Sequence, residues 1–229
     1  MTLALCQSEL RAPEEVVGAA HDPCRCLEDG TRQSLSFFSD LPAGCRVLDV
    51  GCGEGVHLRA LAARGCEVVG VDCNAVHVHR LRREGYQVLQ GTAEVLPMAD
   101  ESVDAIVCSV VLPYTDERRS IAEWSRVLRG GGEVRASYHG LGYALRQLCG
   151  SAGARGRLYG ARTIVNSVVY RTFGRRLPGF LGDTIYQSRK WLRRYYSESQ
   201  LMLQREYIRW SSGLPDIVFH ALIKDPLST

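Results

Sequence analysis

The sequence predicts an α/β fold built on a doubly wound sheet, and three observations carry this prediction. From residue 45 to about residue 138, short apolar runs alternate with stretches whose apolar residues have helical spacing. The connections between them are short, which is typical of βαβ units with parallel strands and helices on both faces. A glycine-rich turn follows the first apolar run, at the sheet edge where such folds bind ligands.

The individual elements follow from periodicity. Buried strands are predicted over 45–50, 66–72, 86–90, 103–110 and 133–138. Helices are predicted from Leu58 to the stop at Gly65, over 74–84, and over 117–129. Asn74 is expected to cap the second helix, and the three glycines at 130–132 to end the third.

The flanking regions divide the chain further. We expect an N-terminal helical cap over 1–44, the core over 45–138, a basic lid or substrate region over 139–200, and closing strands of the sheet over 201–229. Residues 140–182 have weak periodicity and many Gly, Arg and Tyr, so they are interpreted as an insertion over the open sheet edge. A further helix is expected within 183–199, and the closing strands within 201–208 and 216–223.

Bulk composition excludes several classes of protein. The 229 residues are 45% hydrophobic and 23% charged, as in ordinary globular proteins. No apolar run approaches the roughly 18–20 residues that cross a membrane, and the N-terminus lacks the features of an export signal. A cytoplasmic location is therefore expected, while the oligomeric state stays open.

The nine cysteines are scattered and odd in number. Cys45, Cys66 and Cys108 lie in or beside predicted strands, which favours reduced, buried thiols over a disulfide framework. Cys24 and Cys26 form a C-x-C pair without a second pair at zinc-ligand spacing, so no metal site is expected. The role of the pair stays open.

Charge is distributed unevenly. Residues 1–134 carry 13 Arg against 20 Asp and Glu, whereas residues 135–210 carry 14 Lys and Arg against three acids, with eight of the ten tyrosines. Arginine favours carboxylates and phosphates, and tyrosine supplies flat pocket walls. One interpretation is a lid that binds an anionic or aromatic acceptor; the other is a solvated basic face. The candidate acceptor-binding residues are Tyr114, Tyr138, Tyr143, Arg175 and Arg176.

The most informative segment is the turn after the first strand. Glycines at 51, 53 and 55 form a G-x-G-x-G pattern, and Asp49 precedes them in the strand. Glycine permits a tight turn and a close approach to a ligand. Asp72 ends the second strand, 21 residues after Gly51, where a carboxylate can accept both hydroxyls of a ribose. Two further motifs follow, the 91–97 segment and Asp104 with the helix end at 124–132.

With these four motifs in this order, the sequence resembles class I S-adenosylmethionine (SAM)-dependent methyltransferases of the small-molecule, ubiquinone-biosynthesis-like type. The resemblance covers residues 45–138, and the closing strands match more loosely. It implies a Rossmann-like, seven-stranded sheet that is mostly parallel with the last strand antiparallel. It also implies SAM as cofactor, with S-adenosylhomocysteine as its product, and a small-molecule methyl acceptor.

The resemblance also implies a cofactor site. Around the methionine part it places Asp49, Gly51, Cys52, Gly53 and Gly55; at the ribose Asp72; at the adenine Cys73, Asn74, Ala93 and Glu94; near the sulfonium Ser109 and Val110. Thr92, Tyr114 and Gly131 depart from the family, which often has Asp, His and Pro there. Alternatively, the glycines form only a tight turn and Asp72 only caps a helix.

The expected chemistry needs few catalytic groups. SAM is an activated donor, so the enzyme mainly aligns the acceptor and excludes water, and a base is needed only for a protonated acceptor. The catalytic candidates are His139, which follows the fifth strand and has a suitable intrinsic pKa, and Tyr114. Tyr138 and Asp116 are further candidate bases. A surface histidine and a simple pocket wall are the alternatives.

Other functions stay open. The basic region also fits a nucleic-acid methyltransferase, although the fourth strand ends without an N-P-P-Y type motif. A non-catalytic SAM-binding scaffold is a second alternative. A thiol or metalloid acceptor is a third, because of Cys24, Cys26 and Cys149. The chain has 26 Arg and two Lys, which indicates a GC-rich bacterial genome and suggests a natural-product intermediate as acceptor.

Overall fold

The computed structural model describes residues 32–150 and 153–227, and its seven strands form one sheet in the order β3-β2-β1-β4-β5-β7-β6. The strands are β1 (Arg46–Val50), β2 (Glu67–Asp72), β3 (Gln87–Gln90), β4 (Val103–Ser109), β5 (Leu128–His139), β6 (Leu201–Ser211) and β7 (Leu214–Lys224). The first five strands pair in parallel, and β7 runs antiparallel to both β5 and β6. The predicted doubly wound, mostly parallel sheet with an antiparallel last strand is therefore confirmed.

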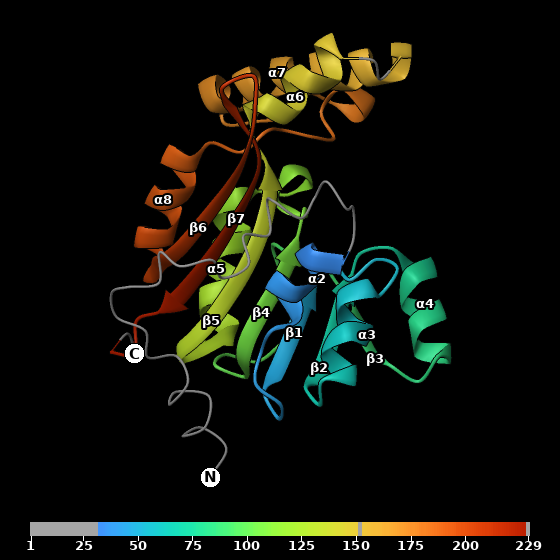
Figure 1. Cartoon of the computed structure of the whole chain (residues 1–229), viewed down its shortest axis with the longest axis vertical. Coiled ribbons are helices and arrows are strands. Elements are labelled where there is room, and N and C mark those ends of the chain that lie inside the picture. Colours follow the sequence, from blue (N-terminus) through green and yellow to red (C-terminus); the bar gives the residue numbers. More distant parts are fainter. Residues whose placement is uncertain (1–31, 151–152, 228–229) are drawn as a thin grey trace.

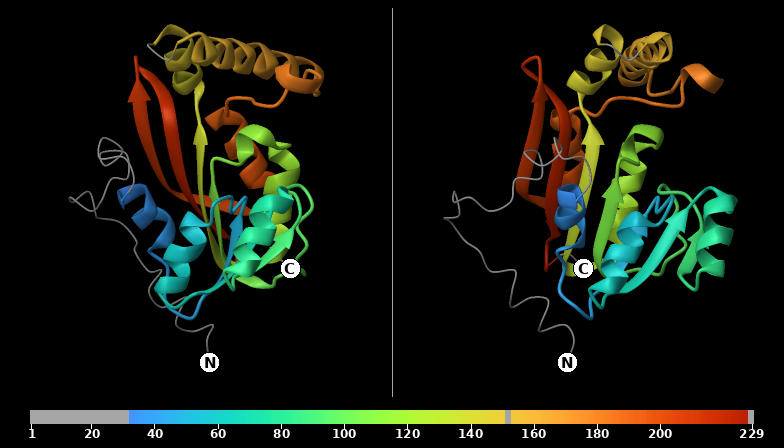
Figure 2. Two further views of the ribbon diagram at one scale, coloured as in Figure 1. Left: turned by 90° about the vertical axis from the view of Figure 1, so that its right-hand side faces the viewer. Right: turned by 45° about the vertical axis from the view of Figure 1, so that its right-hand side comes forward.

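Helices cover both faces of this sheet (Figures 1 and 2). They are α2 (Arg32–Ser39), α3 (Val56–Ala63), α4 (Ala75–Arg83), α5 (Glu117–Val127), α6 (Leu141–Cys149), α7 (Gly153–Phe173) and α8 (Arg189–Glu198), with the short 3-10 helices η2 (Leu112–Tyr114) and η3 (Gly179–Leu181). Alternation along β1 separates two cores. Leu48 packs with residues of α5 and α8, whereas Val47 packs with residues of α2 and α3.

The predicted helix over 74–84 is confirmed as α4. The side chain of Asn74 accepts a hydrogen bond from the Val76 amide at 3.0 Å, as an N-cap does. The predicted helix over 117–129 is two residues too long. Chain from Leu128 onward belongs to β5, because Leu128 pairs with Val103 across the sheet, and Gly131 (φ 76°) follows in the left-handed region that favours glycine.

The region after β5 is more regular than its sequence suggested. α6 and α7 lie one on the other across the end of the sheet where the parallel strands finish (Figure 1). Gly160 of α7 allows this packing, because a Cβ there would lie 2.4 Å from the Ala144 carbonyl of α6. α8 lies elsewhere, against α5 and β6. The proposed lid range of 139–200 thus spans two differently placed parts.

The expected N-terminal cap over 1–44 is described only in part. Residues 1–31, with Cys24 and Cys26, lie outside the described residues. α2 packs on the sheet through Phe38, whose ring centroid is 6.1 Å from that of Phe219. Cys45, Cys66 and Cys108 are buried, as expected. In the described ranges no helix is long and apolar enough to cross a membrane.

Candidate cofactor and acceptor site

A cavity of about 540 Å³ opens where β1, β2 and β4 end. Seven of the twelve cofactor residues expected from the sequence line it: Gly51, Asp72, Cys73, Ala93, Glu94, Ser109 and Val110. The other wall residues are Val71, His77, Gly91, Thr92, Val111, Tyr114 and Thr115. Three of the four sequence motifs therefore meet at one place, as the carboxyl ends of parallel strands do. The fourth, Asp104 with the helix end at 124–132, does not line the cavity; Asp104 lies near the start of β4 and pairs with Arg129.

Asp72 lies at the centre of this convergence. Its Oδ2 accepts a hydrogen bond from the Gly53 amide at 2.7 Å, and its Oδ1 accepts one from the Asn74 amide at 2.8 Å. The carboxylate is therefore held between the turn after β1 and the turn after β2. Gly53 and Asn74 do not line the cavity; they orient the acid that does.

Glycine is required at two positions of the first turn for different structural reasons. Gly51 has φ 68°, and a Cβ there would lie 2.3 Å from the Val111 side chain in the opposite wall. Gly55 has φ 78°, and a Cβ there would lie 2.6 Å from Leu81 of α4. Gly51 therefore permits the close approach that shapes the cavity, whereas Gly55 permits α3 and α4 to pack.

Asp49 is buried just before this turn. Burial raises the pKa of its carboxyl to about 7; the charge of Asp72 adds to the rise, and a main-chain hydrogen bond from Leu58 opposes it. Its Oδ2 has no hydrogen-bond partner among the described residues. A buried carboxylate with an unused acceptor fits a cationic ligand group. Neighbouring Cys52 is a neutral thiol, since burial raises its pKa to about 12.

The wall after β4 carries a strained residue. Val110 has φ 56°, a left-handed conformation that is a genuine outlier for a β-branched side chain. Its amide donates to the Ser137 carbonyl at 2.9 Å, which holds the chain in that conformation. Ser109 and Ser137 lie side by side on β4 and β5, with their hydroxyl oxygens 3.5 Å apart. Strain of this kind collects at functional sites.

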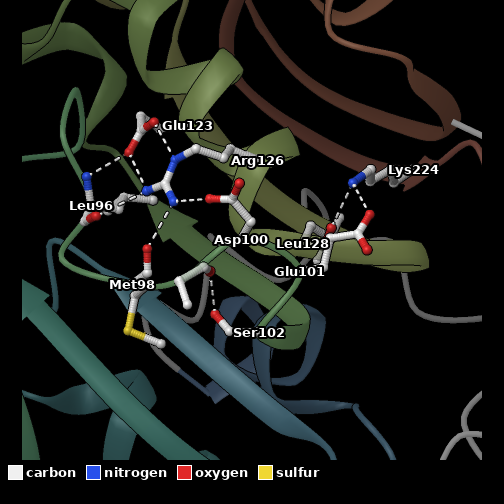
Figure 3. A network of polar contacts seen from close by, with 10 residues as sticks. Leu96, Met98, Asp100, Glu101, Ser102, Glu123, Arg126, Leu128 and Lys224 are labelled. Carbon is white, nitrogen blue, oxygen red and sulfur yellow. Dashed lines mark hydrogen bonds and ion pairs between the residues drawn. The ribbon is translucent and has the colours of Figure 1, made fainter. Parts of the chain in front are cut away.

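The chain that follows Ala93 and Glu94 is held from α5 at residues 96–100 (Figure 3). The Arg126 guanidinium donates to the carbonyls of Leu96 at 3.0 Å and Met98 at 2.8 Å, and it pairs with Glu123 and Asp100. Sequence reasoning missed this role, because Arg126 lies about 30 positions along the chain from this segment. The one indication in the sequence was that Arg126 is a basic residue in the last turn of α5.

Aromatic side chains continue from the cavity toward the end of β5. Tyr114 is a hydrogen-bond partner of Tyr159, and its pKa is raised chiefly by burial. The Tyr159 and Tyr143 rings meet edge to face with centroids 6.2 Å apart, and Tyr143 stacks on His139 at 3.6 Å. We name Tyr114, Tyr159, Tyr143 and His139 the aromatic row.

His139 is a neutral but weakly basic imidazole that lies outside the cavity lining, at the end of the aromatic row. Burial lowers its pKa to about 4; Asp216 opposes this shift, while Arg146 and Arg209 add to it. The imidazole is therefore neutral at pH 7, and its buried Nδ1 has no hydrogen-bond partner among the described residues. The stacked Tyr143 ring restricts its orientation.

Two further candidates from the sequence, Tyr138 as an acceptor contact or base and Asp116 as a base, lie elsewhere. Tyr138 is fully buried on the opposite face of β5 from His139, since successive strand residues alternate, and its hydroxyl bonds His220 at 3.1 Å. Asp116, also considered as a base, caps α5 by accepting from the Arg119 amide at 3.1 Å. Neither is brought to the cavity.

The two adjacent arginines differ from each other. Arg176 donates to the main-chain carbonyls of Pro113, Thr115 and Asp183 and so joins the segment after α7 to the cavity wall. Arg175 is exposed at the surface. The structure brings neither guanidinium into the cavity lining.

His77 is one of several wall residues that sequence reasoning passed over. Its Nδ1 lies 3.6 Å from Asp72 Oδ1, and its Nε2 lies 3.5 Å from Glu54 Oε1. The signal was its position in the first turn of α4, three residues after Asn74. Val71, Val111 and Thr115 had no comparable signal, because only their places in the fold bring them to the cavity.

Comparison with known families agrees with this geometry. Residues 48–136 match a family described as a methyltransferase domain. Among solved structures, geranyl diphosphate methyltransferase in complex with SAM has a TM-score of 0.60 with 19% identity, over 91% of this chain and 92% of that one. The similarity of that structure concerns the fold.

Curated relatives match over the same part of the chain. An uncharacterised methyltransferase of Mycobacterium tuberculosis is 42% identical over 97 residues, which are 41% of this chain and 40% of the relative. A ubiquinone biosynthesis O-methyltransferase of Alkalilimnicola ehrlichii is 33% identical over 122 residues, 48% and 49% of the two chains. A ribosomal RNA small subunit methyltransferase C of Chromohalobacter salexigens is 48% identical over 99 residues, 40% and 29%. The chain thus spans less than half the length of these relatives.

Proposed function

We propose that the protein is a class I, SAM-dependent methyltransferase that transfers a methyl group from SAM to a small-molecule acceptor, in support of which residues 48–136 match a methyltransferase domain. The observation that carries this proposal is the position of Asp72. Its carboxylate lines the cavity while two main-chain amides hold it, and a carboxylate at the end of the second strand is the usual partner of a ribose.

The residues present fit this cofactor. An ionised carboxylate offers about four acceptor positions, so Asp72 keeps two for ribose hydroxyls after binding Gly53 and Asn74. The unused Asp49 oxygen fits the ammonium group of the methionine part. When bound, SAM supplies a methyl group on a sulfonium, which needs no further activation. The remaining tasks are to orient the acceptor, exclude water and hold a proton.

The aromatic row favours a flat acceptor. Tyrosine rings bind planar or unsaturated bodies through their faces, and Tyr114 belongs both to the row and to the cavity wall. The Arg176 guanidinium is bound to main-chain carbonyls, so it is not free to bind an anionic acceptor. This weakens the expectation that the acceptor is anionic. We propose an aromatic acceptor, such as a bacterial natural-product intermediate, with neutral His139 taking its proton where the acceptor has one.

A nucleic-acid acceptor is the second candidate, because residues 135–210 are strongly basic and one relative is named for ribosomal RNA. Several of these arginines act within the protein. Arg162 pairs with Asp183, Arg171 donates to the Tyr186 carbonyl, and Arg189 pairs with Glu206. Their use in internal contacts reduces the charge available for phosphates and favours the small-molecule proposal.

Calorimetric titration with SAM and S-adenosylhomocysteine tests the cofactor. Asp72→Asn removes the charge but keeps the shape, and loss of charge-assisted hydrogen bonds of about 1.5–3 kcal/mol predicts roughly 10–100-fold weaker binding. Glu67→Gln is the matched control, since Glu67 is an exposed carboxylate at the other end of β2. If wild type fails to bind, or if both variants bind like wild type, the proposal is wrong.

Transfer of labelled methyl groups tests the acceptor. Wild-type protein is incubated with labelled SAM and either a panel of phenols and hydroxyquinones or total bacterial RNA. Label in a phenol or hydroxyquinone supports the proposal, and label in RNA alone contradicts it. With the acceptor identified, His139→Asn should lower the rate while leaving SAM affinity unchanged.

A further inference from the structure

The outermost helix, α7, packs on the protein through small and polar residues. α7 lies across the sheet end as the far layer of the molecule (Figures 1 and 2). The fully or nearly buried residues of α7 are small or polar: Gly160, Thr163, Asn166 and Ser167. Surface helices usually bury their apolar side and expose their polar side, so this arrangement needs an explanation.

The polar inner side has a clear structural task. Asn166 Nδ2 donates to the carbonyls of Gly182 at 3.1 Å and Thr184 at 2.8 Å, and its Oδ1 accepts from the Leu177 amide at 2.9 Å. Ser167 Oγ accepts from the Tyr186 amide at 2.9 Å. Residues 177–187 lie outside the sheet and the longer helices, so α7 satisfies their buried main chain.

Several apolar residues of α7 therefore point outward, while Ile164 and Val169 are partly buried. Leu158, Val165 and Val168 are 50%, 54% and 55% exposed, and their spacing of seven and three positions places them on one side of the helix. Phe173, at the helix end, is 69% exposed, and Leu181 of η3 is 49% exposed. We name these five residues the apolar face.

The charges around the apolar face are mostly positive, the exception being half-exposed Asp183, which pairs with Arg162 of α7. Residues 140–182 contain seven arginines and no Asp or Glu. Arg155 and Arg157 at the start of α7, and Arg175 beyond its end, are exposed. An apolar stripe bordered by arginines matches an anionic bilayer, whose surface attracts cations while its interior accepts apolar side chains. Two copies of the chain meeting through this face would bring their arginines together, which disfavours self-association.

We infer that α7 docks the protein on an anionic lipid bilayer, with the helix lying in the plane of the interface and the apolar face inserted among the acyl chains. This inference does not depend on the proposed methyl transfer. Tyr159 and Tyr170 lie on the inner half of the same helix, and Tyr159 belongs to the aromatic row. Docking therefore brings the candidate acceptor site within one helix layer of the lipid, where amphiphilic aromatic compounds concentrate.

Flotation of the full chain with lipid vesicles tests the inference. Vesicles of phosphatidylcholine with phosphatidylglycerol at a ratio of 3:1 are compared with phosphatidylcholine alone, at low and high salt. We expect binding to the anionic vesicles, weakened by salt. Val165→Asp with Val168→Asp should reduce binding at least tenfold. Val76→Asp is the matched control, since Val76 of α4 is 71% exposed and distant from the lid, and it should leave binding unchanged.

Further readouts make the result decisive. Circular dichroism melts of each variant establish that it is folded, and Arg155→Gln with Arg157→Gln should weaken binding to anionic vesicles several-fold while binding to neutral vesicles stays low. Failure of the wild type to float with anionic vesicles would overturn the inference. Equal binding by the α7 and Val76 variants, or a dimer in light scattering that only the α7 variants disrupt, would overturn it too. Unchanged calorimetric affinity for SAM in the α7 variants separates docking from the cofactor site.

Discussion

The Gly53 amide donates to Asp72 Oδ2 at 2.7 Å, which joins the turn after β1 to the end of β2. The two motifs are 19 residues apart in the chain and act as one unit. Asp72 contributes the charge, and the glycine turn determines where that charge is held. Changes in either motif should therefore affect cofactor affinity together.

Gly51→Ala should close the cavity. The new Cβ would lie 2.3 Å from Val111, in addition to the left-handed backbone cost of about 1–2 kcal/mol. Gly85→Ala is the matched control, because Gly85 also has positive φ (91°) with no atom within 4 Å of a Cβ. Urea unfolding should show the backbone cost in both variants, whereas calorimetry should show at least tenfold weaker SAM binding only for Gly51→Ala.

Adding Val111→Ala to Gly51→Ala extends this test. Removing the side chain that the new Cβ meets should restore part of the SAM affinity. If the double variant binds no better than Gly51→Ala, the clash with Val111 is not the cause of the loss.

Asp49→Asn should change how stability depends on pH. The pKa of Asp49 is about 7 in the folded state and 3.8 in the unfolded state. Between these two pH values, the folded state therefore binds a proton on Asp49 that the unfolded state does not. Wild type therefore loses stability as pH rises from about 4 through 7, and the variant does not. The free energy of unfolding of the variant minus that of wild type should therefore increase by about 3 kcal/mol as the pH rises over that range. A constant difference would contradict the burial effect, and SAM affinity should fall in the variant.

Arg176→Gln should loosen the cavity wall. Its guanidinium binds the carbonyls of Pro113 and Thr115, which flank Tyr114. Hydrogen exchange over residues 112–116 should accelerate, and SAM should bind several-fold more weakly. Arg175→Gln is the control, since Arg175 is the exposed neighbouring residue and its substitution removes the same positive charge. Equal effects of the two variants would indicate a general electrostatic contribution instead.

His220→Leu should destabilise the protein without affecting the cofactor. His220 is fully buried, with Nε2 3.1 Å from the Tyr138 hydroxyl and 2.9 Å from Glu206, and Nδ1 3.0 Å from the Tyr196 hydroxyl. Its loss leaves buried polar groups unpaired, which costs about 3 kcal/mol or more. Urea unfolding measures this cost, with exposed His79→Leu expected within about 0.5 kcal/mol of wild type. An equal loss in both variants would contradict a stabilising network.

Periodicity determined the sheet and the helices of the core. Apolar runs at 45–50 and 66–72 became β1 and β2, and Asn74 begins α4 as its capping chemistry predicts. These features are local, because strand burial and helix caps depend on neighbouring residues. The first cofactor anchors, Gly51 and Asp72, followed from the same local patterns and lie in the cavity wall.

Contacts between distant segments depended on tertiary structure. Composition indicated a basic, tyrosine-rich lid, but only packing against residues 177–187 explains why α7 buries Asn166 and exposes Val165. Likewise, alternation predicts that Tyr138 and His139 face opposite ways, yet only the folded sheet determines which of them joins the aromatic row. Sequence patterns report the preferences of neighbouring residues, whereas a side chain's partners are determined by which segments the fold brings together.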